Sequence, residues 1–271
     1  MKKYYITFLL VLIILLGVVG FLLVNTIKSY LITIQESFSN ISATPIVSKP
    51  ILSGKYTYYI KDGISIISGN FDINVFKSSE DNLLSPKQLA IQDSDQIVVN
   101  GGYFAEDKSY IGLLWDGSNQ LGSLSKDNQQ ATHIVNFNKI SGKLTFKSDL
   151  DFTPKDLIEN SDNIYFQTGP LIIDNNELQT SLIDHSLNGN QSSLRSFIGY
   201  TSSGRIFVGI TTQGYDLRQL GEKLLSKDFF EGETISVVNL DGGSSTAIYS
   251  QENAEVSFRD FKTLPYLIEF K

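Results

Sequence analysis

The chain of 271 residues contains no cysteine. A domain without cysteine has neither disulfide bonds nor a lipidated cysteine, so its stability has to come from a packed core. Histidine is also scarce, because only His133 and His185 occur and they lie far apart in the sequence. Two isolated histidines give little support for a histidine-based zinc site or a Ser-His-Asp triad. We therefore predict that each is a surface or structural residue.

Positive charge is in short supply too. The sequence has 22 Lys and Arg against 29 Asp and Glu, which gives a formal net charge of −7. No cluster of Lys or Arg occurs after residue 50. Binding to a nucleic-acid backbone requires a concentrated basic face, so we exclude nucleic acid as a partner. The acidic residues are spread thinly, which is typical of a solubilising surface.

Charge is absent altogether from residues 4–24, which follow Lys2 and Lys3 and consist almost wholly of apolar residues and glycine. About 20 such residues are enough to span a bilayer as a helix. We predict an uncleaved signal anchor within segment 1–28, with a cleaved signal peptide as the alternative. The two lysines favour a cytoplasmic N-terminus, which makes the chain a single-pass membrane protein with an extracytoplasmic C-terminal domain.

The remaining chain divides into a tether and one domain. Residues 29–50 are polar and contain Pro45 and Pro50, which suits a tether. Residues 51–271 have a length that a single domain commonly reaches. The oligomeric state and the release of the anchor are left open by the sequence.

Alternating apolar residues separated by turn residues dominate this domain. One hairpin is predicted over 133–147, and another turns at 202–204. Ser85-Pro86 predicts a short helix, and Asp216 followed by leucines at helical spacing predicts an amphipathic one. We predict an α+β fold with a large mixed or antiparallel sheet, a few short helices and one amphipathic helix, preceded by the transmembrane helix.

A cluster of polar residues and glycines separates two strand-like runs between residues 236 and 249. It contains Asn239, Asp241, the pair Gly242-Gly243 and the hydroxyl residues from Ser244 to Thr246. Adjacent glycines allow close approach of a ligand and leave amides free to face an anion. Asp-Gly is also a strong turn signal, so a plain β-hairpin is the alternative.

Three other segments have similar chemistry and precede this cluster. They are Asn100-Gly-Gly-Tyr-Phe104, Thr168-Gly-Pro-Leu171 and Arg195 with Ile198-Gly199. In this order and with these gaps, the four segments resemble those of the phosphodiester glycosidase family, over most of residues 56–270. The resemblance implies removal of a sugar from a sugar-1-phosphate diester by cleavage at the anomeric carbon.

Such a reaction needs anion binding and stabilisation of an oxocarbenium-like centre. We predict Asp241, Arg195 and Asn100 as catalytic residues. Arg195 would bind the phosphate through its planar fork, and Asp241 would stabilise the cation, attack it or activate water. The predicted substrate-binding residues are Gly101, Gly102, Tyr103, Thr168, Gly169, Thr212, Asn239, Gly242, Gly243, Ser244 and Ser245.

Each assignment has a structural alternative: a strand-edge charge for Arg195, a turn cap for Asp241, and satisfaction of backbone groups for Asn100 and Thr168. We predict no metal site and no cofactor, since no spaced Asp-x-Asp loop occurs, although Asp, Asn and Ser oxygens are ligands that Ca²⁺ or Mg²⁺ accepts.

The predicted function is hydrolysis of sugar-1-phosphodiester linkages in surface or extracellular glycopolymers, with a glycan as partner and residues 4–24 in the membrane. The alternative is a non-catalytic glycan-binding or assembly module in exopolysaccharide or cell-envelope biogenesis. The last motif has two glycines where the family commonly has three, which favours that alternative.

Overall fold

The computed structural model describes residues 51–53, 55–79, 82–91, 96–126, 128–153, 155, 157 and 162–271. The predicted anchor in 1–28 and the predicted tether over 29–50 lie outside the described residues. Within the described part of the chain, no helix is both long enough and apolar enough to cross a membrane.

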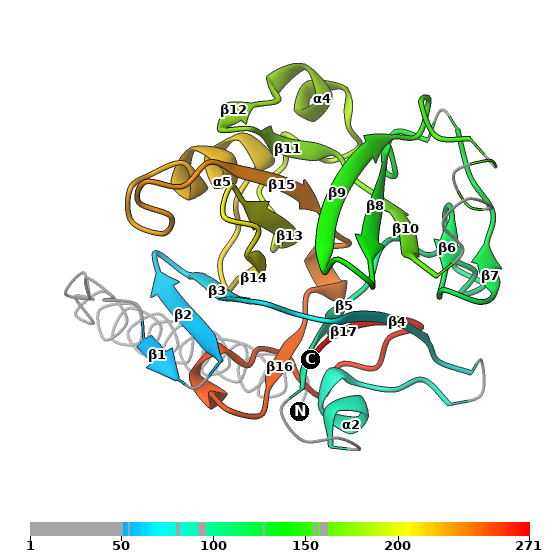
Figure 1. Cartoon of the computed structure of the whole chain (residues 1–271), viewed down its shortest axis with the longest axis horizontal. Helices are drawn as coiled ribbons and strands as arrows, with labels where there is room; N and C mark the ends of the chain where they lie inside the picture. Colours follow the sequence, from blue (N-terminus) through cyan, green and yellow to red (C-terminus); the bar gives the residue numbers. More distant parts are fainter. Residues whose placement is uncertain are drawn as a thin grey trace, which may run out of the picture. The chain divides into compact units, whose positions relative to one another are not determined.

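Strands dominate the described residues (Figure 1). Their bounds are β1 (Ile51–Ser53), β2 (Tyr56–Lys61), β3 (Ile64–Gly69), β4 (Ile73–Lys77), β5 (Ile97–Asn100), β6 (Leu114–Trp115), β7 (Gln120–Gly122), β8 (His133–Asn138), β9 (Lys143–Ser148), β10 (Ile164–Thr168), β11 (Leu171–Asp174), β12 (Glu177–Leu178), β13 (Ser196–Thr201), β14 (Ile206–Thr211), β15 (Ile235–Asn239), β16 (Ile248–Ser250) and β17 (Tyr266–Phe270). The helices are α2 (Pro86–Ala90), α4 (Thr180–His185) and α5 (Leu217–Leu224), with 3-10 turns η1 (Gly243–Ser245) and η2 (Ala254–Val256).

The strands form three sheets, and neighbouring strands run antiparallel. The eight-stranded sheet has the order β1-β2-β3-β14-β13-β15-β11-β12, the five-stranded sheet β7-β6-β10-β8-β9, and the four-stranded sheet β16-β5-β17-β4. The prediction of an α+β fold rich in antiparallel sheet is confirmed. The single large sheet that we expected is divided, because apolar faces of separate sheets pack on one another.

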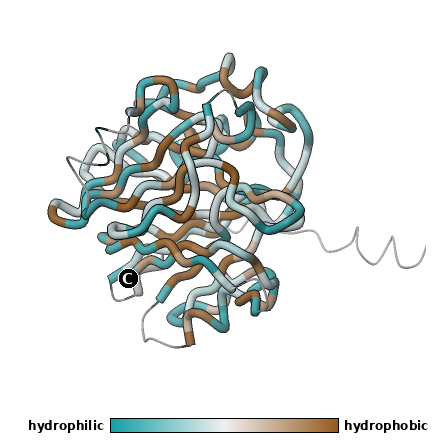
Figure 2. The backbone as a smooth tube through the Cα atoms, turned by 90° about the vertical axis from the view of Figure 1, so that its right-hand side faces the viewer, coloured by the Kyte–Doolittle hydropathy of each residue, from teal (hydrophilic) through white to brown (hydrophobic). Residues whose placement is uncertain are grey.

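The largest buried cluster takes residues from all three sheets, including Val208 of β14, Phe166 of β10 and Ile268 of β17. Hydrophobic positions occur repeatedly along the strands of the domain (Figure 2). Burial of such faces is the main favourable contribution to folding, and it fixes how the strand ends meet.

Both predicted helices are confirmed, and each begins with a capping box. Ser85 caps α2 with Gln88, and Asp216 caps α5 with Gln219. No local pattern predicted α4, because its first residue follows Gln179, which makes no side-chain cap, and Ile183 is its one buried residue.

The two predicted hairpins are confirmed as β8–β9 and β13–β14. The hairpin alternative for the Asp-Gly segment is wrong. β15 pairs with β13 and β11, whereas β16 pairs with β5 in a different sheet. Residues 240–247 therefore pass from the eight-stranded to the four-stranded sheet, and this crossing carries Asp241.

Candidate active site

Three strand ends from three sheets meet at one place in the domain. The Gly169 amide donates to the carbonyl of Asn239 over 3.1 Å, which joins the β10–β11 turn to the end of β15. The Asp241 amide donates to the carbonyl of Gly101 over 3.3 Å, which joins the crossing segment to the residue after β5. Three of the four motif segments are thus in direct contact, as a shared site requires.

The fourth segment, at the start of β13, is bound to the same crossing. The Leu240 amide donates to the carbonyl of Ser196 over 2.8 Å, and the Gly243 amide donates to that of Leu194 over 2.8 Å. Arg195 lies between these two acceptors in sequence. All four segments therefore surround Asp241.

Asp241 is the carboxyl group of this cluster. Its Oδ1 accepts a hydrogen bond from the Gly242 amide at 2.8 Å, and the Ser245 side chain also bonds to it. Burial nevertheless raises the pKa of Asp241 to about 6, since desolvation outweighs these bonds. A carboxyl group with a pKa near the working pH can both accept and donate a proton.

Tyr103 lies beside this carboxyl group. Its hydroxyl donates to the carbonyl of Gly169 at 2.8 Å and accepts from Nδ2 of Asn239 at 2.7 Å. Burial raises the pKa of Tyr103, the charge of Asp241 raises it further, and Arg195 acts in the opposite direction. Tyr103 therefore lies close enough to Asp241 and Arg195 for both charges to act on its pKa. Because the pKa is raised, the hydroxyl stays protonated.

Asn239 is buried at the end of β15 and is only partly satisfied. Its Nδ2 faces Tyr103 and the carbonyls of Gly169 and Leu240. Its Oδ1 is buried and has no hydrogen-bond partner among the described residues. Buried polar atoms are nearly always paired, so this oxygen is a candidate acceptor for a substrate hydroxyl or a water molecule.

Arg195 is buried, and most of its guanidinium binds the protein itself. Nε donates to the carbonyl of Tyr215 at 2.9 Å, and Nη2 donates to those of Asn188 at 2.8 Å and Gln191 at 2.5 Å. Burial lowers the pKa of Arg195. Nη1 makes no hydrogen bond with the described residues. We predicted that the guanidinium would bind phosphate through two nitrogens. Since Nε and Nη2 are bonded to backbone carbonyls, only Nη1 remains to bind an anion.

The side chain of Asn100 is fully used within the protein. Oδ1 accepts from the Ser196 hydroxyl at 2.6 Å and from the Ala247 amide at 3.2 Å. Nδ2 donates to the carbonyls of Asp241 at 2.7 Å and Gly101 at 3.2 Å. Asn100 thus fixes the backbone of Asp241, and this geometry supports a positioning role in place of direct contact with substrate.

Thr168 is also bonded internally, because its buried hydroxyl donates to the carbonyl of Asn239 at 2.8 Å. Ser196 is the residue that sequence reasoning missed. It directly follows Arg195 in a quoted segment, but nothing local indicates that its hydroxyl reaches Asn100.

Three of the four glycine amides at Gly101-Gly102 and Gly242-Gly243 are bonded within the protein, so they are not free for the anion nest that we expected there. The amides of Gly101, Gly242 and Gly243 donate to the carbonyl of Tyr266, the Asp241 carboxylate and the carbonyl of Leu194, respectively. Gly243 has φ of 60°, a backbone conformation that glycine adopts readily. These glycines shape the crossing that holds Asp241.

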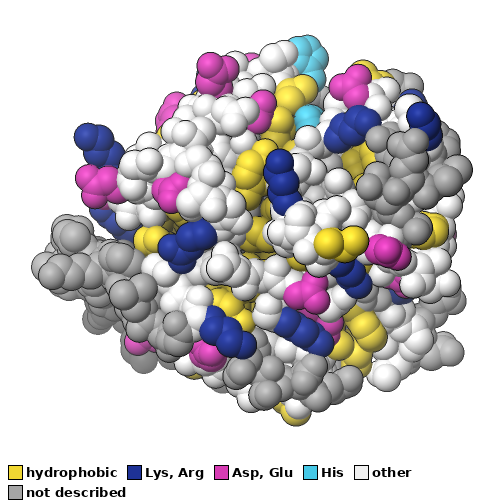
Figure 3. All heavy atoms as spheres, viewed as in Figure 1, with side chains coloured by type: hydrophobic (Ala, Val, Ile, Leu, Met, Phe, Trp, Pro, Cys, Tyr) yellow, Lys and Arg dark blue, Asp and Glu magenta, His cyan; other side chains and the backbone are white. Residues whose placement is uncertain are grey.

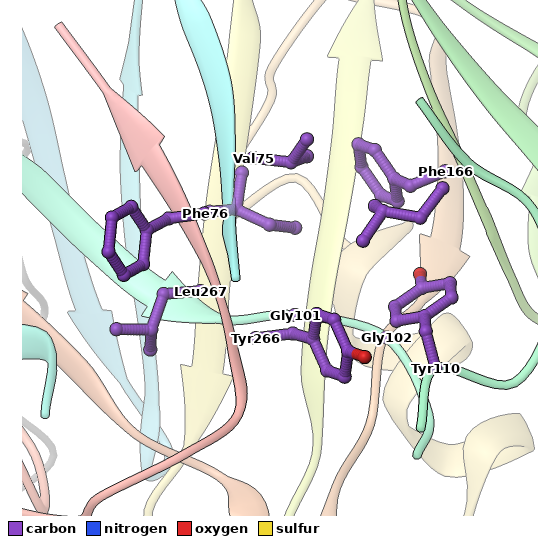
Figure 4. A pocket seen from close by; sticks show the side chains of 10 residues that line it. Val75, Phe76, Gly101, Gly102, Tyr110, Phe166, Tyr266 and Leu267 are labelled. Carbon is purple, nitrogen blue, oxygen red and sulfur yellow. The ribbon is translucent and has the colours of Figure 1, made fainter. Parts of the chain in front are cut away.

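Gly102 is required for packing. A Cβ atom there would lie 2.3 Å from the hydroxyl oxygen of Tyr110. Gly101 and Gly102 border a small apolar cavity of about 10 Å³ together with Tyr110 and Tyr266 (Figure 4). A cavity of this volume is comparable to one water molecule and cannot hold a sugar.

Two predicted substrate-binding residues are exposed. Thr212 lies on the turn after β14, where its amide and its hydroxyl both donate to the carbonyl of Gly63, at 2.7 and 3.2 Å. Ser244 lies in η1 with its side chain in solvent. Thr212 shares no hydrogen bond with the Asp241 cluster in the described part of the chain.

Within the described residues, no group of three or more histidine or acidic side chains is arranged to hold a metal ion. Asp241 contributes a single carboxylate to the cluster.

The sequence profile of the phosphodiester glycosidase family matches residues 93–265, which include all four motif segments. The chain belongs to this family. Curated protein sequences give no significant match.

Two solved structures share its fold. One is the catalytic domain of zebrafish N-acetylglucosamine-1-phosphodiester alpha-N-acetylglucosaminidase, auto-inhibited by its pro-peptide, with a TM-score of 0.54, 16% identity, and coverage of 79% of this chain and 80% of that one. The other is a hypothetical protein from Synechocystis, with a TM-score of 0.55, 11% identity, and coverage of 82% of this chain and 61% of that one. At these identities the likeness establishes the fold.

Proposed function

We propose that this phosphodiester glycosidase family member is a membrane-anchored, extracytoplasmic hydrolase of sugar-1-phosphodiester linkages in surface or extracellular glycopolymers. The observation that carries the proposal is the half-buried carboxyl group of Asp241, which lies where all four motif segments meet and whose pKa is raised to about 6. Tyr103 lies close enough to both Asp241 and Arg195 for their charges to shift its pKa. The apolar stretch 4–24 supports the membrane anchor.

The geometry suggests how the residues would share the reaction. The free Nη1 of Arg195 would donate to one phosphate oxygen, and the positive charge would stabilise the departing phosphomonoester. Above a pH of about 6, Asp241 is mostly ionised. Its carboxylate would then face the developing positive charge at the anomeric carbon, as nucleophile, as base for water or as a fixed counter-charge.

A non-catalytic glycan-binding module is the second candidate. It is favoured by the internal bonding of Asn100, Thr168 and most of Arg195, which leaves few side chains free for chemistry. The pair of glycines in place of three in the last motif points the same way.

The test is incubation of the purified full-length chain with a panel of sugar-1-phosphodiesters, followed by measurement of free reducing sugar. We expect Asp241→Asn to lower kcat by about 10²- to 10⁴-fold, the usual contribution of a positioned acid or base. Asp184→Asn is the matched control, because Asp184 is an exposed carboxylate paired with Arg218.

Hydrolysis that persists unchanged in Asp241→Asn would overturn the site. Absence of turnover on every panel member, together with measurable glycan affinity, would favour the binding module.

A further inference from the structure

A second pocket, of about 320 Å³, lies beside the candidate active site, and the proposed reaction does not use it. Thr132, His133, Asp149, Leu150, Leu182 and His185 are among the residues that line it. Its volume is at the lower end of the range for small-molecule sites. We propose that it binds a hydrocarbon chain esterified to the substrate's phosphate, an inference that rests on the proposed function.

The pocket shares one wall with the Asp241 cluster. A Cβ atom on Gly169 would lie 2.7 Å from Oγ1 of Thr132, so this lining residue packs directly on the turn after β10. The carbonyl of the same glycine accepts the Tyr103 hydroxyl. His133 of β8 pairs with Thr168 in register. A substituent leaving the site past Tyr103 and Gly169 would therefore reach this pocket.

The segment at the end of α4 connects the pocket to Arg195. His185 and Ser186 line the pocket, and the carbonyl of Asn188, two residues later, is held by Arg195 at 2.8 Å. The guanidinium that would bind the phosphate thus also fixes the segment next to the pocket. A phosphate bound by Arg195 would therefore have its second ester group, the one that is not the sugar, next to this pocket.

The electrostatics of the pocket disfavour a second phosphate group. None of the described lining residues is Lys or Arg, and Asp149 contributes a carboxyl group. Burial lowers the pKa of His133 to about 4, so this imidazole is neutral at pH 7. A second phosphate would have no Lys or Arg partner here, and the described lining offers no Phe, Tyr or Trp ring for a nucleobase. Nucleoside diphosphate sugars therefore fit poorly.

Leucines provide the apolar contact surface. Leu150 lines the pocket and is 64% exposed, and Leu187, next to the lining residue Ser186, is 50% exposed. Leu182 lines it as well and packs against the main core. Histidine side chains lie near hydrophobic ones on the face that carries α4 (Figure 3). A hydrocarbon chain would remove this leucine surface from water.

The experiment compares two substrates that have the same sugar-1-phosphate and differ in the ester group, methyl or n-octyl, both tested with the full-length chain. We expect the octyl ester to have the lower KM. In Leu150→Gln, the ratio of the octyl KM to the methyl KM should rise about five- to tenfold, the loss expected for one leucine contact. Ile140→Gln is the matched control, because Ile140 is 87% exposed on the β8–β9 turn and does not line the pocket.

Equal KM values for the two esters in the wild-type chain would overturn the inference and leave the proposed function intact. So would a lower KM for a hexose ester or a nucleoside diphosphate sugar, or an unchanged ratio in Leu150→Gln. If neither these esters nor any member of the sugar-1-phosphodiester panel is hydrolysed, the proposed function fails. Calorimetric titration with n-octyl phosphate then tests the pocket alone, and affinity that Leu150→Gln weakens supports it, whereas unchanged or absent affinity overturns it.

Discussion

The polar residues of the motifs fall into two groups that the sequence does not distinguish. Asn100, Thr168 and Arg195 direct most of their hydrogen-bonding capacity to other groups of the protein, chiefly backbone carbonyls. Asp241 and Asn239 retain capacity: the first is a half-buried carboxyl group with a raised pKa, and the second has an unpaired buried oxygen. We call these the fastening group and the open group. Their contrast indicates that much of the motif builds the site, while a smaller part faces the substrate.

The largest stability effect should come from the fastening group, through Arg195→Ala. The change removes the guanidinium donor from the carbonyls of Tyr215, Asn188 and Gln191, although the first two keep a backbone amide donor. A hydrogen bond to a charged group contributes about 1.5–3 kcal/mol, and three such bonds are lost, so we expect the free energy of unfolding in urea to fall by at least about 3 kcal/mol.

Arg218→Ala is the control, because its ion pair with Asp184 is exposed and should contribute less than about 1 kcal/mol. Arg195→Lys should recover only part of the loss, since an ammonium group cannot reproduce the three bonds of the fork. Equal effects of Arg195→Ala and Arg218→Ala would show that Arg195 does not belong to the fastening group.

The open group should respond in the opposite direction. Burial raises the pKa of Asp241 to about 6, so the folded state binds this proton more tightly than the unfolded chain does. The resulting stabilisation is complete below the unfolded pKa and is lost as the pH rises through 6. Asp241→Asn removes a carboxylate that is costly when ionised, so at pH 8 it should be more stable than the wild type by about 1–3 kcal/mol.

Thermal unfolding measured from pH 4 to pH 8 checks this prediction. The difference in stability between Asp241→Asn and the wild type should become smaller towards pH 4. Asp184→Asn serves as the exposed counterpart and should show no such trend. If Asp241→Asn is less stable than the wild type at pH 8, the hydrogen bonds from Gly242 and Ser245 outweigh the desolvation of the carboxylate. Asp241 would then belong to the fastening group.

Local signals predicted a large part of the fold, since the caps at Ser85 and Asp216 and the β8–β9 and β13–β14 hairpins depend on neighbouring residues. Sheet membership was not predicted, because β16 pairs with β5 across about 150 positions of sequence and no local pattern encodes that choice.

The same limit applies to the site. The motif order identified the segments that surround Asp241, including Arg195 and Asn239. It did not reveal that the Asn100 amide would be saturated by the hydroxyl of Ser196 and by distant backbone groups. Partners of that kind are set by tertiary packing, so a motif locates a site more reliably than it assigns roles within it.

The smallest effect should come from Thr212, which we predicted as a substrate-binding residue. Its hydroxyl donates to the carbonyl of Gly63, which the Thr212 amide already binds at 2.7 Å, and the side chain is exposed. Thr212→Val should therefore change the free energy of unfolding by less than about 0.5 kcal/mol, as surface substitutions usually do. Thr168→Val is the matched comparison, since it removes a buried bond to the Asn239 carbonyl, which keeps the Gly169 amide as donor, and should cost about 0.5–1.5 kcal/mol. If Thr212→Val instead leaves stability unchanged but raises KM several-fold, the exposed turn after β14 contacts the substrate, and the open group extends beyond the crossing that carries Asp241.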